Sequence, residues 1–263
     1  MPNPRSLSAL GLVLLLLAGC TGEAPTLGTQ VAGDPALAAT PEGATPDAPG
    51  FNPFSDRPAT AGAPREVMQN PSIAEIMKPG DLPEMALGRK DAPVTIIQYA
   101  SMTCPYCRQF QIDVFPALKA EYIDTGKVRY VLREFPIGKQ SGLATVALRC
   151  APPDKYFALY DKLMRQQSAW VSQDVRPDPI LKVAAQVGMT RAQFDSCREN
   201  RSMITALNGI KERGRTLGII GTPNFFVAGK LVKSVLGLKD LRALVDAALA
   251  GRVAASEGAG KAH

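Results

Sequence analysis

The stretch Val94-Thr95-Ile96-Ile97-Gln98-Tyr99, followed four residues later by Cys104-Pro105-Tyr106-Cys107, decides the fold of this chain. The first segment is rich in β-branched and aromatic side chains, which favour a buried strand. The second segment opens a helical pattern, because apolar residues then recur at positions 110, 114, 118 and 122. We therefore expect a strand that leads directly into a helix with two cysteines on its first turn.

Two thiols at this spacing predict thiol–disulfide exchange. They can close a disulfide with each other or attack one in another molecule. The N-terminus of a helix carries partial positive charge and unpaired N–H groups, and both stabilise a thiolate. The thiolate, and not the thiol, is the form that carries out exchange.

The elements around this motif indicate a βαβ unit. A short edge strand is expected at 86–88 and a second strand at 128–133, after the turn at 124–127. Pro116 lies inside the helical pattern and should kink the helix, because proline has no N–H to donate.

The next hundred or so residues contain helical patterns and no strand pattern. Helices are expected at 143–150, at 156–165, from Asp178-Pro179 to Gly188, from a capping box at Thr190-Arg191-Ala192-Gln193, and at 202–216. Strand patterns return at 224–227 and 231–234, before a final amphipathic helix. The sequence therefore predicts an α/β domain with an all-helical subdomain inserted at about 140–200.

The N-terminus predicts a signal peptide at 1–19. Its apolar stretch at 10–18 is too short for a stable membrane-spanning helix. The stretch ends in Leu17-Ala18-Gly19-Cys20, which resembles the bacterial lipobox. That resemblance implies lipidation of Cys20, export, and a periplasmic protein anchored to a membrane. An ordinary secretory signal cleaved near Ala18 is the alternative.

The region between this signal and the CxxC motif has few large apolar side chains that could form a core. Residues 20–65 are rich in Pro, Ala, Gly and Thr and predict a disordered tether. A short helix is possible within 66–81, over 67–77. We expect the folded domain at 82–251 and a disordered tail at 252–263.

The cysteine count supports this division of the chain. The sequence has five cysteines, and loss of Cys20 to a lipid leaves four. Cys104 and Cys107 are the expected redox pair, and an oxidising compartment permits Cys150 and Cys197 to form a structural disulfide. Such a disulfide stabilises a domain by roughly 4 kcal/mol in the chain-entropy model. The alternative is that Cys150 and Cys197 are buried free thiols.

Three sequence features together resemble a known family. They are the CxxC motif, the segment Arg133-Glu134-Phe135-Pro136, and Gly221-Thr222-Pro223-Asn224-Phe225-Phe226 before the last strand pair. With a helical insert between them, they are similar to the thioredoxin superfamily and, within it, to the DsbA subfamily of exported bacterial thiol:disulfide oxidoreductases. The resemblance covers about 82–251. It implies a thioredoxin-like fold with a central mixed sheet flanked by helices.

The resemblance assigns a role to each residue of the motif. Cys104 would be the exposed nucleophile and Cys107 the buried resolving thiol, while Pro105 and Tyr106 would tune the thiolate. Many DsbA proteins have His at the position of Tyr106, and Tyr lacks a titratable positive charge near neutral pH. The direction of electron flow therefore stays open between a disulfide donor and an exported reductase or isomerase.

The resemblance also implies how substrates would bind. Pro223 would be a cis-proline facing the cysteines, and Thr222 would present backbone groups to an extended peptide. The implied partners are reduced, unfolded or partly folded exported proteins, and a membrane or soluble redox protein. A non-catalytic, chaperone-like peptide-binding lipoprotein remains an alternative.

Composition argues against several other functions. The net charge is +6, but no block of like charges occurs, so nucleic acid is not an expected partner. The only histidine is His263, which disfavours Ser-His catalysis and mixed Cys and His zinc sites. Arg108 follows Cys107, so the pattern for covalent haem attachment is absent. We expect neither a cofactor nor a metal site, although two thiolates alone could handle copper.

Two further residues stand out. Glu134 follows a predicted strand, and we expect a solvated strand end there. A buried carboxylate that assists proton transfer to Cys107 is the second interpretation. Trp170 is expected to pack within the helical insert.

Overall fold

The computed structural model describes residues 67–260. The predicted signal peptide at 1–19, the lipidation site Cys20, the tether at 20–65 and the single histidine, His263, lie outside the described residues.

The described residues form one mixed sheet. Its strands are β1 (Met85–Leu87), β2 (Val94–Ala100), β3 (Val128–Glu134), β4 (Asn224–Val227) and β5 (Lys230–Val232), in the order β1-β3-β2-β4-β5. The central pair β2 and β3 is parallel, whereas all other neighbours are antiparallel. The predicted α/β class with a central mixed sheet is confirmed. The last strand begins and ends earlier than the expected 231–234.

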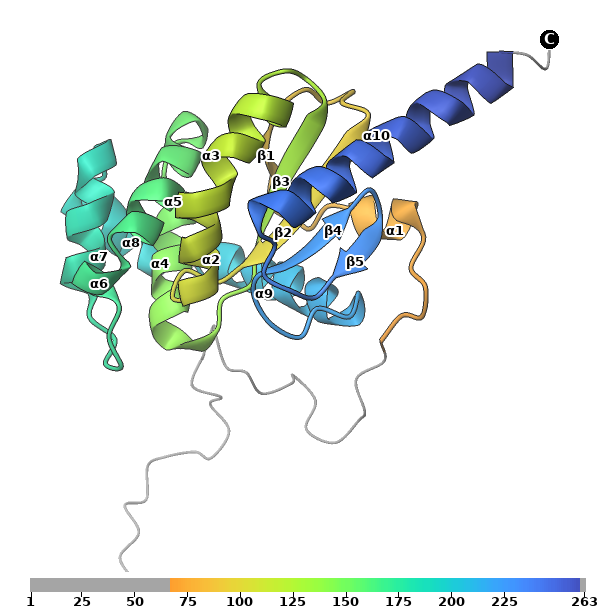
Figure 1. The fold of residues 1–263 in the computed structure, drawn as a ribbon. Helices are drawn as coiled ribbons and strands as arrows, with labels where there is room; N and C mark the ends of the chain where they lie inside the picture. The colour runs from red at the N-terminus through yellow and green to blue at the C-terminus, as the bar shows by residue number, and fades with distance from the viewer. Residues whose placement is uncertain (1–66, 261–263) are drawn as a thin grey trace, which may run out of the picture. The chain divides into compact units, whose positions relative to one another are not determined.

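Successive side chains of a strand point to opposite faces of the sheet, so each face packs against its own set of helices. Ile96 packs in the core with Phe110 and Phe225, whereas its neighbour Ile97 packs on the opposite face with Phe226. One face carries α2 (Pro105–Gln109), α3 (Phe115–Leu118) and α10 (Leu238–Gly260), and the other carries α1 (Ile73–Met77) and the end of α9 (Arg201–Thr216) (Figure 1).

The helix after the CxxC motif is interrupted. Between α2 and α3 lies a π-helical turn, Phe110–Val114, and a second one, Lys119–Ile123, follows α3. Pro116 lies in the first turn of α3, where it needs no intrahelical donor. The interruption thus lies next to the proline where the sequence predicts a kink.

The helical insert lies between β3 and α9. It consists of α4 (Gly138–Cys150), α5 (Tyr156–Arg165), α6 (Gln167–Trp170), α7 (Pro177–Ala184) and α8 (Arg191–Arg198), with short 3₁₀ turns at Pro153–Lys155 and Ala185–Val187. These helices gather beyond one side of the sheet (Figure 1). The predicted capping box forms, since Thr190 and Gln193 satisfy each other's backbone N–H groups. Trp170 is buried, and its indole N–H donates to the carbonyl of Leu163.

Both ends of the domain differ from expectation. The first helix spans only Ile73–Met77, because Ser72 and Glu75 form a capping box that fixes its start. At the other end, α10 continues to Gly260, so the tail expected to be disordered from residue 252 is helical over most of its length. The alanines of this segment favour a helix, a preference that the prediction underweighted.

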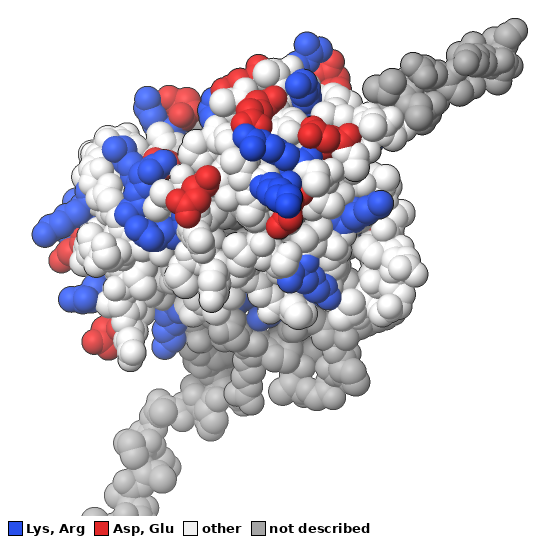
Figure 2. Space-filling model, viewed as in Figure 1, with Lys and Arg blue, Asp and Glu red and all other residues white. Residues whose placement is uncertain are grey.

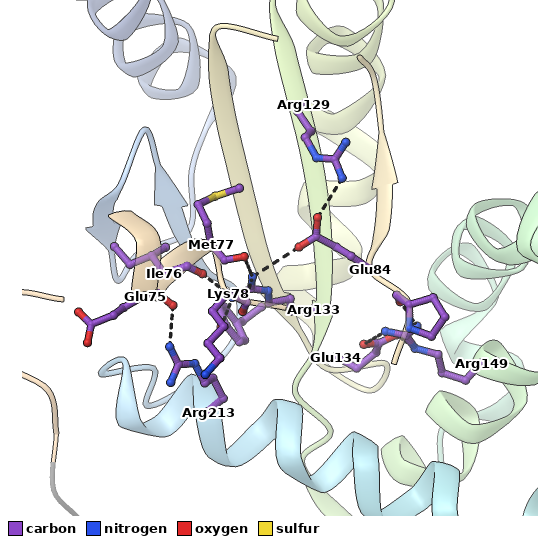
Figure 3. Close-up of polar contacts among 12 residues, drawn as sticks. Glu75, Ile76, Met77, Lys78, Glu84, Arg129, Arg133, Glu134, Arg149 and Arg213 are labelled. Atoms are coloured by element: carbon purple, nitrogen blue, oxygen red, sulfur yellow. Dashed lines mark hydrogen bonds and ion pairs between the residues drawn. The ribbon is translucent and has the colours of Figure 1, made fainter. Parts of the chain in front are cut away.

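Arginine side chains of β3 and α9 hold α1 in place (Figure 3). Arg133 donates to the carbonyls of Ile76, Met77 and Lys78, and Arg213 donates to that of Glu75. These bonds satisfy carbonyl groups that a helix leaves unpaired at its C-terminal end.

Acidic and basic side chains are interspersed on the face shown in Figure 2. Over the described residues, no helix combines the length and the apolar character needed to cross a bilayer.

Candidate active site

The two cysteines of the motif occupy different environments on the first turn of α2. Cys104 is the N-cap residue and is partly exposed, whereas Cys107 is completely buried. Both are free thiols in this structure. The backbone N–H of Cys107 points to the Cys104 sulfur at 3.4 Å, and Pro105 occupies the first helical position. The helix start therefore presents a donor to the Cys104 sulfur, as the sequence predicts.

Sheet pairing brings Thr222 and Pro223 to the same place. β4 runs antiparallel to β2, with Tyr99 opposite Asn224, so the segment before β4 lies beside the end of β2. The Thr222–Pro223 peptide bond is cis. The Cys104 thiol donates to the Thr222 carbonyl at 3.1 Å.

The surroundings shift the two thiols in opposite directions. Hydrogen bonding from the Cys107 thiol lowers the pKa of Cys104 to about 6, and the Thr222 side chain and the N–H groups of Cys107 and Tyr106 contribute. Burial raises the pKa of Cys107 well above its usual value, and the neighbouring Cys104 raises it further. One thiolate near the surface is thus paired with one thiol that stays protonated.

Two exposed apolar side chains lie close in the sequence to the cysteines or to Thr222. Tyr106, between the cysteines, is 56% exposed, and Ile220, two residues before Thr222, is 79% exposed. Exposed apolar groups at a reactive site suit a partner that offers apolar side chains of its own.

The active-site loop, residues 101–103, is held by the helical insert. The Ser141 hydroxyl of α4 accepts from its backbone, and the Gln167 side-chain amide of α6 donates to its backbone. Neither residue was singled out from the sequence. The sequence signal that could have identified them is a polar residue on the buried face of a predicted helix, as Ser141 is on α4 and Gln167 on α6.

Glu134 contradicts the solvated strand end expected from the sequence. It is completely buried and accepts from Arg149 at 2.8 Å (Figure 3). It also accepts from the Tyr156 hydroxyl at 2.5 Å. The Arg149 side chain of the insert therefore balances the charge of the carboxylate, and the structure records no hydrogen bond between Glu134 and Cys107. Cys150, the residue after Arg149, forms a disulfide with Cys197 of α8.

Comparison with known proteins agrees with this geometry. A thioredoxin family model matches residues 81–247. The chain belongs to the thioredoxin family. It resembles the crystal structure of alpha-DsbA1 from Wolbachia pipientis, with a TM-score of 0.64 and 25% identity over 70% of this chain and 98% of that chain. Within the family it is a member of the DsbA subfamily.

Two relatives are similar in sequence. A provisionally named protein-disulfide oxidoreductase of Rickettsia bellii is 31% identical over 171 residues, which cover 63% of this chain and 64% of that relative. Disulfide bond formation protein D of Bacillus subtilis is 25% identical over 173 residues, covering 63% of this chain and 77% of that protein. The match thus spans slightly less than two thirds of the Rickettsia relative.

Proposed function

We propose that the protein is a thiol–disulfide oxidoreductase that introduces disulfide bonds into exported proteins through Cys104 and Cys107. The observation that carries this proposal is the contrast between the two thiols. Cys104 is the partly exposed N-cap of α2 and its pKa is lowered to about 6, whereas Cys107 is completely buried and its pKa is raised. A low pKa at the exposed cysteine stabilises the reduced enzyme, which makes the oxidised enzyme a stronger oxidant than it would be with an ordinary thiol.

The reaction begins with the Cys104–Cys107 disulfide. A substrate thiolate attacks the Cys104 sulfur, the bond between the cysteines breaks, and Cys107 leaves as a thiolate that takes up a proton because its pKa is high. The substrate is now joined to Cys104. A second substrate thiolate attacks the substrate sulfur of this mixed disulfide, and Cys104 leaves as a stable thiolate. Two electrons have passed to the enzyme, and a redox partner must accept them before the next cycle.

The substrate class follows from the surface around Cys104. A partly folded protein offers extended backbone and apolar side chains. We propose that Thr222 and Pro223 align the backbone by strand addition, and that the exposed Tyr106 and Ile220 contact the side chains. Pro105 and Tyr106 would tune the thiolate. The proposed location is the periplasm, with lipid attached at Cys20, and rests on the sequence of residues 1–20.

The first test is the reduction potential of the Cys104–Cys107 pair, measured by equilibration with glutathione and thiol trapping. We expect a value more oxidising than that of thioredoxin, about −270 mV, and shifted toward that of DsbA, about −120 mV. A value near about −270 mV, as in thioredoxin, would instead make the protein an exported reductant.

A second test addresses the non-catalytic alternative. When Cys104 of Cys107→Ser attacks a disulfide in an oxidised, unfolded substrate, one substrate thiolate leaves and the mixed disulfide should accumulate, because the Cys107 thiol that would displace the substrate is gone. Cys104→Ser should form none and should lose activity in a cell-based assay of disulfide-dependent folding. Full activity of Cys104→Ser in that assay would identify a peptide-binding chaperone instead.

A further inference from the structure

The helical insert forms hydrogen bonds with both backbone polar groups of one residue in the active-site loop, Met102. The backbone N–H of Met102 donates to the Ser141 hydroxyl at 3.1 Å, and the carbonyl of Met102 accepts from the Gln167 side-chain amide at 2.8 Å. The Met102 side chain is itself completely buried. A loop that lies between β2 and α2 has no ladder of its own, so these side chains supply the partners that its backbone needs.

The same two residues reach the ends of the loop. Gln167 also donates to the carbonyl of Cys104 at 3.1 Å. The Ser141 hydroxyl shares a 2.7 Å hydrogen bond with that of Ser101, whose carbonyl accepts from the N–H of Cys104 at 3.1 Å. Both backbone polar groups of Cys104 are therefore linked to the insert, one directly and one through Ser101.

These hydrogen bonds are shielded from solvent. Ser141 is completely buried and Gln167 is 7% exposed, so water does not replace a lost partner easily. Each residue comes from a different helix of the insert, α4 and α6, so two independent attachments fix the loop.

We propose that Ser141 and Gln167 are positioning residues that hold Cys104 in reactive register with the start of α2. This inference rests on the proposed function, since it concerns the nucleophile of that reaction. It gives the helical insert a role in the chemistry, in addition to any role in covering the site.

The physical consequence concerns the Cys104 thiolate. Its sulfur lies 3.4 Å from the Cys107 N–H, and small displacements weaken a contact of that length. Without the hydrogen bonds with Ser141 and Gln167, the loop would sample positions in which the thiolate loses this donor and part of the electrostatic field of the helix terminus. Cys104 would then ionise less readily and oxidise substrates less completely.

The test uses Gln167→Met, Ser141→Ala and the double variant, each in the full-length reduced and oxidised protein. Gln140→Met is the matched control, because Gln140 is also a buried glutamine of the insert, but its amide bonds the carbonyl of Trp170 and the N–H of Arg176. Thr145→Val is the control for Ser141→Ala, since the Thr145 hydroxyl is buried on the same helix and bonds only the Ser141 carbonyl.

Two measurements report on Cys104: thiolate absorbance against pH, and the equilibrium constant with glutathione. We expect Gln167→Met to raise the pKa of Cys104 by about half a unit and the double variant to raise it by about one unit. In the double variant, the equilibrium constant for oxidation of glutathione by the enzyme should fall by roughly tenfold. The control variants should lower the urea midpoint while leaving the pKa and the constant unchanged.

A double variant that loses stability but keeps the wild-type pKa and equilibrium constant would overturn the inference. If the double variant does not fold, the milder Gln167→Met decides by the same two readouts. Failure of the proposed function looks different: the wild-type protein itself would then have an ordinary Cys104 pKa and would not oxidise dithiols.

Discussion

The Glu134 carboxylate and the Arg149 guanidinium form an ion pair closed off from solvent, with side-chain exposures of 0% and 6%. Glu134 ends β3 and Arg149 lies near the end of α4, so the pair fastens the helical insert to the sheet (Figure 3). A buried pair is balanced only while both charges are present.

Glu134→Gln should therefore destabilise the protein by about 3–5 kcal/mol, because it leaves the Arg149 charge buried without a counter-charge. The measurement is the free energy of unfolding in urea. The control is Asp91→Asn in the exposed pair of Arg89 and Asp91, both 69% exposed, where a much smaller change is expected because solvent screens the pair. Equal effects of the two substitutions would contradict a burial-dependent contribution.

The ionisation of Cys104 predicts how the reduced protein depends on pH. Its pKa is about 6 in the folded state against 9.0 ordinarily, so the thiolate stabilises the fold fully above about pH 9. That contribution shrinks as the pH falls and is gone below about 6. Cys107 contributes little between pH 6 and 9, because it is protonated there in the folded protein and largely so in the unfolded chain; above its ordinary pKa of 9.0 its raised pKa opposes folding.

This dependence is measured in two ways. Alkylation of reduced Cys104 should show a midpoint near pH 6. The urea midpoint of the reduced wild type should exceed that of Cys104→Ser at high pH, and the gap should close as the pH falls. Serine is the chosen replacement because it also serves as an N-cap. An alkylation midpoint near pH 9 would contradict the assigned environment.

Two glycines of α9 predict opposite effects of the same substitution. A Cβ at Gly214 would lie 2.7 Å from the Tyr99 ring and 3.3 Å from the Phe135 ring, and both residues are buried. Gly214→Ala should therefore destabilise the protein by about 1–3 kcal/mol through overpacking. At Gly209 the nearest atom is 3.9 Å away, on Asp81, so Gly209→Ala should stabilise the helix by about 0.5–1 kcal/mol. Urea unfolding of both variants decides, and a gain in stability for Gly214→Ala would count against the packing.

The sequence predicted the elements that local patterns determine. The run at 94–99 predicted β2 because β-branched residues crowd a buried strand, and the Thr190 and Gln193 spacing predicted a helix start that the structure contains. The motif itself predicted where a thiolate would be stabilised. The family resemblance implied a central mixed sheet but the strand order was not predicted, since strand pairing between distant segments leaves no periodic pattern in the sequence.

The sequence could not predict contacts that the fold makes between distant segments. Glu134 was expected in solvent because its partners, Arg149 and Tyr156, come from two helices of the insert. Ser141 and Gln167 passed unnoticed for the same reason: their acceptors and donors are backbone groups of a loop far away in the chain. The end of α10 was missed because a Gly- and Ala-containing tail fits both a helix and a disordered segment.

The Cys150–Cys197 disulfide links the end of α4 to α8 across a sequence separation of 47 residues. Replacing both cysteines by alanine should lower the free energy of unfolding by about 4 kcal/mol, since a cross-link of this span restricts the unfolded chain. The effect should be confined to stability. The pKa of Cys104, read from its alkylation rate against pH, should stay at its wild-type value, because the disulfide lies at the end of α4, whereas Ser141, which bonds the loop, lies near the start of that helix. A double variant as stable as the wild type would show that the unfolded chain is already compact there, whereas a shifted Cys104 pKa would show that the disulfide supports the α4 attachment of the loop.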